Sequence, residues 1–208
     1  YEKDELDEWM DVRTPKIDGT NLTIIYKAGK MHLALTRGNG DRGDDVTELA
    51  REIANIPQKI STDHAQVVIN GECVTDNDVE NFRNYVSGAL GLKSPSEFKE
   101  RNIKFIAHDI LSFTMNYTNK IDVLQNMGFF TVLDDAAWDY PCDGVVYRCN
   151  DWQKCQNLGY TSKYPRFAVA LKSRETITAV TTLKEVLWTV GRTGVVSPTG
   201  VVDPVVLD

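Results

Sequence analysis

The sequence lacks long apolar runs, cysteine pairs spaced for metal binding and an excess of positive charge. No stretch approaches the roughly 18 apolar residues that span a bilayer, so we expect no membrane-spanning helix. The four cysteines form no Cys-x-x-Cys pair, and Cys149 and Cys155 have no histidine pair nearby. This spacing argues against a zinc site and favours free thiols in a reducing cytoplasm.

Charge, length and composition set further limits. The net charge of −7 argues against a uniformly basic nucleic-acid coat, although a local basic groove remains compatible with it. The 208 residues suffice for one substantial domain with a buried core, or for one domain with part of another. The sequence contains no internal repeat and no low-complexity tract.

The clearest chemical signal lies at residues 14–22, which read Thr-Pro-Lys-Ile-Asp-Gly-Thr-Asn-Leu. Residues i and i+2 of a strand share a face, so Lys16 and Asp18 are expected to project together. Gly19 leaves room for a ligand near the backbone. A lysine is a nucleophile only when its amine is neutral. Because the pKa of a free lysine is about 10.4, keeping the amine neutral at pH 7 costs about 4.6 kcal/mol. Neighbouring cations are therefore needed to lower the pKa. By itself, the tetrapeptide Lys16-Ile17-Asp18-Gly19 is equally compatible with a surface turn.

A glycine-rich loop follows a predicted hairpin whose strands are residues 22–26 and 31–36. Residues 37–47 contain three glycines and two arginines and lead into a helix predicted at residues 45–54. Free backbone amides before a helix suit an anion such as phosphate. A solvated loop with capping aspartates is the alternative, since the spacing matches neither a Walker loop nor a dinucleotide fingerprint.

Three later residues are candidates for a site, each with a structural alternative. Glu72 lies at the centre of an apolar strand predicted at residues 67–74, so it needs a ligand, a metal or a structural arginine as partner. His108 is compatible with a core histidine, a stacking surface or an acid–base group. Lys172 ends a buried-looking strand, where a snorkelling surface lysine is the alternative. Further strands are predicted at residues 103–110, 143–148 and 167–172, and helices at residues 76–86 and 119–128.

In this order, the features resemble the adenylation (nucleotidyltransferase) domain of NAD-dependent DNA ligases. Lys16-Ile17-Asp18-Gly19 matches the family's K-x-D-G motif, and residues 36–47 are close to its T-R-G-D-G-x-x-G-E-D-V-T. The similarity covers nearly all 208 residues. Further matches are Gly71-Glu72, Arg83-Asn84 with Gly88, Asp143-Gly144-Val145-Val146, Ala170-Leu171-Lys172, and Val190-Gly191-Arg192-Thr193-Gly194 with Pro198.

The resemblance implies a fold and a domain organisation. It implies an α+β nucleotidyltransferase (ATP-grasp-like ligase) fold of antiparallel sheets flanked by helices, at residues 1–180. Residues 181–208 would be the incomplete start of an oligonucleotide-binding (OB-fold) β-barrel. The family's other modules have no counterpart in the sequence, so we expect either a trimmed chain or a small or split enzyme with a second polypeptide. The location implied is cytoplasmic, in a bacterium or, for a viral protein, in the host cell.

The resemblance also implies a mechanism. Lys16 attacks the α-phosphate of NAD, releases nicotinamide mononucleotide and forms lysyl-AMP, and AMP then passes to the 5′-phosphate of a nick in double-stranded DNA for sealing. Lys16, Asp18 and Lys172 are then the catalytic residues, and Glu72 and Asp143 are the expected ligands of Mg²⁺. The implied nucleotide-binding residues are Thr14, Lys16, Ile17, Arg37, Glu72, Arg83, His108, Asp143, Arg148 and Lys172.

Five positions depart from the family pattern. Thr14 stands in place of a glutamate, His108 in place of an aromatic ring that stacks on adenine, and Arg148 in place of a lysine. Asn70 and Gly91 each stand where the family has an arginine. Two alternatives therefore accompany the main hypothesis. One is an ATP-dependent nucleic-acid ligase, which shares K-x-D-G but lacks the glycine-rich arginine loop. The other is a non-catalytic nucleotide-binding subunit of a split ligase.

Overall fold

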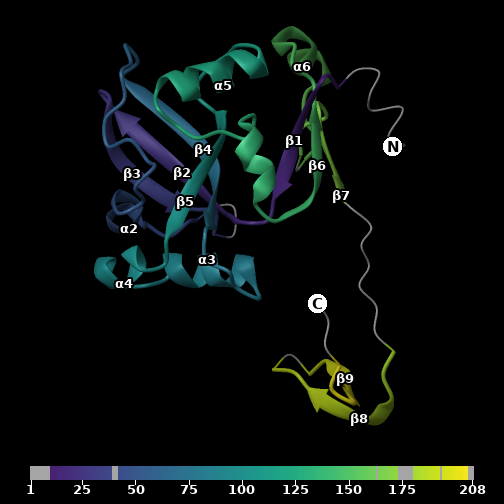
Figure 1. Ribbon diagram of the computed structural model, residues 1–208. Coiled ribbons are helices and arrows are strands. Elements are labelled where there is room, and N and C mark those ends of the chain that lie inside the picture. The colour runs from purple at the N-terminus through teal and green to yellow at the C-terminus, as the bar shows by residue number, and fades with distance from the viewer. Residues whose placement is uncertain (1–9, 39–41, 163, 173–179, 193, 206–208) are drawn as a thin grey trace. The chain divides into compact units, whose positions relative to one another are not determined.

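The computed structural model describes residues 10–38, 42–162, 164–172, 180–192 and 194–205 (Figure 1). The chain divides into two compact units, Tyr1–Ser173 and Arg174–Asp208, and each is described by itself. The tip of the glycine-rich loop, residues 39–41, lies outside the described residues. The predicted domain boundary at residues 180 and 181 adjoins a segment, residues 173–179, that is also outside them.

The first unit is built from antiparallel strands and short helices. Its strands are β1 (Val12–Ile17), β2 (Thr20–Lys27), β3 (Lys30–Thr36), β4 (Gln66–Thr75), β5 (Ile103–Ile110), β6 (Cys142–Arg148) and β7 (Ala168–Lys172). Its helices are α2 (Thr47–Arg51), α3 (Phe82–Leu90), α4 (Pro95–Lys99), α5 (Tyr117–Asn126), α6 (Trp152–Leu158) and the 3₁₀ helix η1 (Asp135–Asp139).

Two antiparallel sheets organise these elements. One has the strand order β1-β6-β7 and the other has the order β3-β2-β4-β5. Helix α5 packs against β5, α3 against β4 and β2, and α2 against β3 (Figure 1). The predicted α+β class, with antiparallel sheets flanked by helices, is therefore confirmed in this coarse form.

The core follows from alternation along the strands. On β2, Leu22, Ile24 and Tyr26 are fully buried while the residues between them are partly exposed. Strand β5 is buried on both faces, with Phe105 and Ile106 both inaccessible to solvent. Each such side chain contributes about 1.5–3 kcal/mol to folding by leaving water.

The segment around Lys16 is where the chain crosses from one sheet to the other. Strand β1 ends at Ile17 and β2 begins at Thr20, so Asp18 and Gly19 form the entire connection. The backbone amide of Asp18 donates to the carbonyl of Pro141 at 2.8 Å, which fixes this connection at the start of β6. Lys16 therefore lies at the junction of the two sheets.

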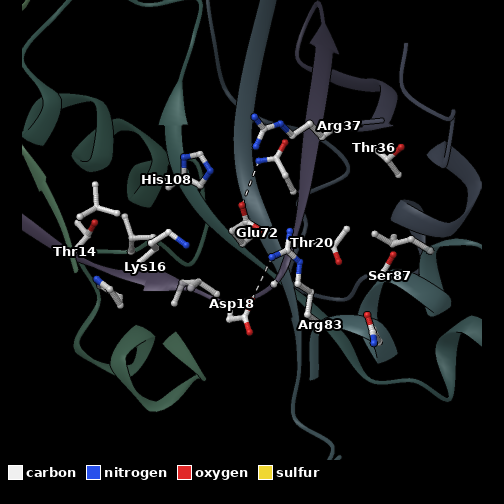
Figure 2. A pocket seen from close by; sticks show the side chains of 18 of the residues that line it. Thr14, Lys16, Asp18, Thr20, Thr36, Arg37, Glu72, Arg83, Ser87 and His108 are labelled. Atoms are coloured by element: carbon white, nitrogen blue, oxygen red, sulfur yellow. Dashed lines mark hydrogen bonds and ion pairs between the residues drawn. The ribbon is translucent and has the colours of Figure 1, made fainter. Parts of the chain in front are cut away.

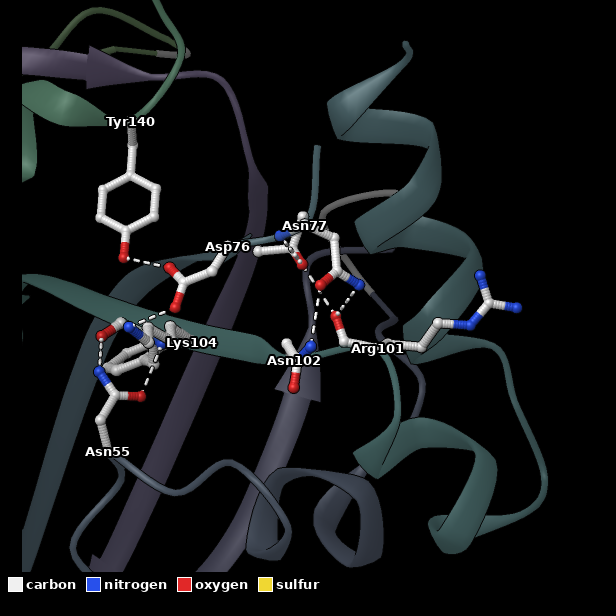
Figure 3. A network of polar contacts seen from close by, with 9 residues as sticks. Asn55, Asp76, Asn77, Arg101, Asn102, Lys104 and Tyr140 are labelled. Carbon is white, nitrogen blue, oxygen red and sulfur yellow. Dashed lines mark hydrogen bonds and ion pairs between the residues drawn. The ribbon is translucent and has the colours of Figure 1, made fainter. Parts of the chain in front are cut away.

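A polar network fixes the segment between β4 and α3 (Figure 3). The Lys104 ammonium lies 2.5 Å from Asp76, and the Tyr140 hydroxyl donates to the same carboxylate at 2.8 Å. The Asn77 side chain donates to the Tyr85 hydroxyl at 2.9 Å and accepts from the Asn102 amide at 2.8 Å. These contacts hold the start of α3, and hence Arg83, relative to the sheet.

The network also explains why one helix prediction was too early at its start. We expected a helix at residues 76–86, but α3 begins at Phe82. The side chains of Asp76 and Asn77 are engaged in the network, and Asn81 caps α3 by accepting from the amide of Asn84. Short polar side chains that bond locally compete with helix formation in this way. The short helices α4 and α6 were not predicted.

The second unit contains an antiparallel pair of strands, β8 (Leu183–Val190) and β9 (Val196–Val202). Strand β9 is continuous and contains Val196, Val201 and Val202. Large apolar side chains of both strands are exposed, Trp188 among them. Among the described residues, no helix is long and apolar enough to cross a membrane.

Candidate active site

A cavity of about 670 Å³ opens beside Lys16 in the first unit. Its walls come from both sheets and from α3 and α5, and the connection between β1 and β2 forms part of its lining. The volume is within the range of about 300–1,000 Å³ found for small-molecule sites. Figure 2 shows Lys16, Glu72 and Arg83 projecting into this space.

Lys16 is held by an acid from the neighbouring strand. Its Nζ lies 2.5 Å from Oδ1 of Asp143, at the start of β6. The Lys172 ammonium lies 3.6 Å from the other oxygen of Asp143, because Gly144 on β6 pairs with Lys172 on β7. Partial burial opposes ionisation of Asp143, but the hydrogen bond and charge of Lys16, with help from Lys172, bring the pKa of this carboxyl below 3.8. Asp143 is therefore ionised at neutral pH.

Asp18 has a different partner. Its Oδ1 lies 3.7 Å from Nη1 of Arg83 on α3, and Figure 2 shows the carboxylate directed toward that guanidinium. Lys16 and Asp18 both line the cavity, as their spacing predicts. However, the pairing of β1 with β6 is irregular between Pro15 and Ile17, and the two charges engage separate groups. Asp143 thus contacts Lys172 as well as Lys16, and Asp18 contacts Arg83.

Glu72 is the acid whose ionisation is most affected by burial in this cavity. Burial raises its pKa from 4.5 to about 7, although the Asn21 amide at 3.5 Å and the charges of Arg83, Lys16 and Arg37 oppose the shift. Near neutral pH the carboxyl is therefore divided between its two protonation states. In either state it can form a hydrogen bond with a ligand hydroxyl, as acceptor or as donor.

One wall of the cavity is lined by strand residues of β1 and β6 and by the rings of Tyr117 and His108. Thr14 on β1 pairs with Val146 on β6, and Arg148 follows two residues later on the same face. The guanidinium of Arg148 lies 4.4 Å from the ring centre of Tyr117, whose hydroxyl donates to the carbonyl of His108 at 2.9 Å. Burial lowers the pKa of His108 to about 4, so its ring is neutral at physiological pH. We call this side of the cavity, lined by Thr14, Val146, Arg148, Tyr117 and His108, the base wall, because its rings and planar guanidinium can stack on a planar ligand.

The opposite side of the cavity carries cations and small polar groups. Arg37 and Arg83 line it together with Thr36 and Ser87. Figure 2 shows Arg37, Thr36 and Ser87 across Glu72 from Thr14 and His108. The Thr36 amide donates to the Asp44 carbonyl at 3.0 Å, and the Thr36 hydroxyl accepts from the Asp44 amide at 3.0 Å. These two bonds close the base of the glycine-rich loop. Arginine side chains can bind phosphate groups, and Lys16 lines the same cavity.

Most of the predicted site residues line the cavity, but two of them do not. Asp143 and Lys172 do not line the cavity; Asp143 contacts Lys16, and Lys172 contacts Asp143. Tyr117 and Thr20 line it and were missed by sequence reasoning, which had no local motif to identify them. The Thr20 hydroxyl is buried without a hydrogen-bond partner in the described structure. The predicted residues in the lining are Thr14, Lys16, Ile17, Asp18, Arg37, Glu72, Arg83, His108 and Arg148.

The acidic groups do not form a closed metal site. Within the part of the chain that the structure describes, no three or more His, Cys, Asp or Glu side chains are grouped to hold a metal ion. Mg²⁺ commonly needs only one or two carboxylates when substrate phosphates supply further ligands. The assignment of Glu72 and Asp143 as magnesium ligands stays a prediction.

Comparison with known proteins identifies the family of this chain. The family model for the NAD-dependent DNA ligase adenylation domain matches residues 4–138 and 133–175. A protein named DNA ligase from Campylobacter concisus is 33% identical, over 98% of this chain and 38% of its own length. DNA ligases from Campylobacter lari and Anaplasma phagocytophilum are 34% and 33% identical, over 93% and 92% of this chain and 36% and 33% of their own lengths. The chain thus spans between 33% and 38% of the length of these curated relatives. It belongs to the family of NAD-dependent DNA ligase adenylation domains.

Proposed function

We propose that this chain carries out the adenylate-transfer chemistry of an NAD-dependent DNA ligase. The observation that carries the proposal is that Lys16 lines one cavity together with the residues of the base wall and with Arg37 and Arg83. NAD is the proposed AMP donor, with its adenine on the base wall and its diphosphate toward Arg37 and Arg83. Nicked double-stranded DNA is the proposed acceptor.

In the proposed first step, the neutral amine of Lys16 attacks the α-phosphorus of NAD. A nitrogen–phosphorus bond forms, the bond to the bridging oxygen breaks, and nicotinamide mononucleotide leaves with that oxygen. The product is lysyl-AMP, whose AMP then passes to the 5′-phosphate of the nick, where the 3′-hydroxyl displaces it. Positioning and neutralisation of phosphate charge supply most of the acceleration in such transfers.

The charges around Lys16 bear on how its proton is lost. Asp143 and Asp18 alone would favour the ammonium form, which cannot attack. Asp143 also engages Lys172, and Asp18 engages Arg83, so neither carboxylate is committed to Lys16 alone. The proposed roles are therefore orientation of the amine by Asp143 and charge balance by Lys172 and Arg83. Lys172 would meet the AMP phosphate once a ligand draws it from Asp143.

Two carboxylates are proposed to support Mg²⁺, and one of them also supports the ribose. Glu72 and Asp143 would contribute one ligand each, with phosphate oxygens and water completing the shell. Such an ion would neutralise charge on the diphosphate. Glu72, with its pKa raised to about 7 by burial, would also hydrogen-bond a ribose hydroxyl.

We also propose that residues 1–180 adopt the nucleotidyltransferase fold and that residues 181–208 begin an OB-type barrel. The antiparallel pair β8 and β9, with its exposed apolar side chains, supports the second part. A second polypeptide that carries further ligase domains, and a cytoplasmic location, stay predictions.

Sealing of a nicked duplex by the complete protein tests this function. With NAD as the only AMP donor we expect sealing, and with ATP in its place we expect none. The Lys16→Ala variant, which lacks the nucleophile, should be inactive with both. Sealing with ATP alone would favour an ATP-dependent ligase, and full activity of Lys16→Ala would favour a non-catalytic binding role.

A further inference from the structure

A cluster of three charged side chains lies behind the base wall. The Lys120 ammonium on α5 lies 2.9 Å from Oδ1 of Asp109 on β5, and Nη1 of Arg148 on β6 lies 3.6 Å from the other carboxylate oxygen. The three side chains are largely buried, with exposed fractions of 12% for Lys120, 14% for Asp109 and 20% for Arg148. Neither Asp109 nor Lys120 lines the main cavity.

This cluster needs an explanation beyond stability. Buried ion pairs often stabilise a fold no better than apolar side chains of similar volume, because the charges must lose their water. The Lys120–Asp109–Arg148 cluster joins two strands and a helix at one point, and only Arg148 extends from it to the ligand cavity. Its effect is therefore to fix the place of one guanidinium.

A second cavity shows why the guanidinium needs fixing. This cavity, of about 140 Å³, lies behind the base wall and is lined by Asp109, Lys120, Tyr117 and Arg148. Arg148 and Tyr117 line both cavities and so separate them. Arg148 has free volume on either side, and the Tyr117 ring supports one face of its guanidinium without fixing the direction of its N–H groups. Asp109 supplies a second contact, an ion pair with Nη1 at 3.6 Å that draws one end of the guanidinium toward β5.

We propose that Asp109, itself held by Lys120, positions Arg148 so that the remaining N–H donors of its guanidinium read acceptor atoms on the edge of the bound nucleobase. The inference rests on the proposed function and on the expected nucleotide-binding role of Arg148, and it adds Asp109 and Lys120 as positioning residues. A guanidinium carries five N–H donors in a planar fork, so one edge can engage Asp109 while another faces the ligand. The neighbours of Arg148 on the wall are Thr14, Val146, Tyr117 and His108, which suit a base and not a phosphate.

The first test measures lysyl-AMP formation by the complete protein as a function of NAD concentration. Asp109→Asn keeps the size of the side chain but removes its charge, and Arg148→Met removes the guanidinium. We expect each variant to raise the KM for NAD by about tenfold and to change kcat by less than about threefold, as for a lost ground-state contact. The double variant should raise KM no further, because Asp109 acts through Arg148.

Glu48→Gln provides a matched control. It removes the charge of a carboxylate paired with Arg51 at 3.8 Å on the exposed surface of α2, outside both cavities. This variant should keep the KM of the unsubstituted protein. An unchanged KM in Asp109→Asn, or a fully additive rise in the double variant, would overturn the positioning role. Failure of the unsubstituted protein to form lysyl-AMP would instead refute the proposed function.

The second test distinguishes base reading from phosphate binding. It compares the KM for NAD with that for the analogue in which hypoxanthine replaces adenine. If Arg148 reads the base edge, the ratio of the two KM values should change by about threefold or more in both Asp109→Asn and Arg148→Met. An unchanged ratio would overturn the inference. Arg148→Met leaves the Lys120–Asp109 pair intact, so it decides the question even where Asp109→Asn does not fold.

Discussion

Lys16 Nζ and Asp143 Oδ1 lie 2.5 Å apart although 127 positions separate the two residues in the chain. The contact is made by the pairing of β1 with β6, which brings the end of the first strand beside the start of the sixth. Lys16 also adjoins the connection to the second sheet. The placement of the proposed nucleophile therefore depends on the assembly of both sheets and not on its local motif alone.

Gly19→Ala should destabilise the protein. An added Cβ would lie 2.3 Å from the backbone carbonyl oxygen of Cys73, so the connection between the sheets would have to shift. We expect a loss of about 1–3 kcal/mol in the free energy of unfolding, measured by urea titration. Gly88→Ala is the control, because a Cβ there meets nothing within 4 Å and alanine favours helix α3 by about 1 kcal/mol. Equal stabilities of the two variants would contradict this account.

Glu72 should make the stability of the protein fall as pH rises. Its pKa is raised from 4.5 to about 7 by burial, so between these values the folded state keeps a proton that the unfolded chain has lost. Protonated Glu72 therefore contributes about 3 kcal/mol to the free energy of unfolding below about pH 4.5, at 1.36 kcal/mol per pH unit. This contribution is lost as the pH rises through 7.

Urea unfolding from pH 4.5 to 8 measures this effect when the unsubstituted protein is compared with Glu72→Gln. The glutamine variant lacks the titrating group, so its stability relative to the unsubstituted protein should increase with pH. Parallel curves for the two proteins over this range would show that burial does not perturb Glu72.

His108→Phe should strengthen nucleotide binding if His108 contributes a stacking surface. Burial holds the pKa of His108 at about 4, so the ring stacks as a neutral imidazole at pH 7, with less area than a phenyl ring. We expect His108→Phe to lower the KM for NAD by about threefold and His108→Ala to raise it by about threefold to tenfold. The same KM in all three proteins would remove His108 from the base wall.

The sequence predicted the strands well because their signals are local. Alternation along β2 and the apolar run of β5 indicated both strands, and the order of motifs indicated the family. The start of α3 was predicted too early, since the competition from Asn77 depends on partners such as Tyr85 and Asn102 that only the folded chain brings near.

The sequence predicted the site residues that belong to a motif. It did not reveal the residues that only tertiary contacts bring to the site. Lys16 was identified from its neighbours in the sequence. Tyr117, Asp109 and Lys120 have no such signal, because their relation to Arg148 arises from the packing of α5 and β5 beside β6. The placement of Asp143 and Lys172 behind Lys16, outside the cavity lining, was likewise visible only in the structure.

Intact-mass analysis of the complete protein before and after incubation with NAD tests the central claim most directly. The account predicts a gain of one AMP per chain, located on Lys16 by peptide mapping and absent from Lys16→Arg, which keeps the positive charge but cannot act as the nucleophile. No AMP adduct on the unsubstituted protein, or an adduct on another residue that persists in Lys16→Arg, would contradict it.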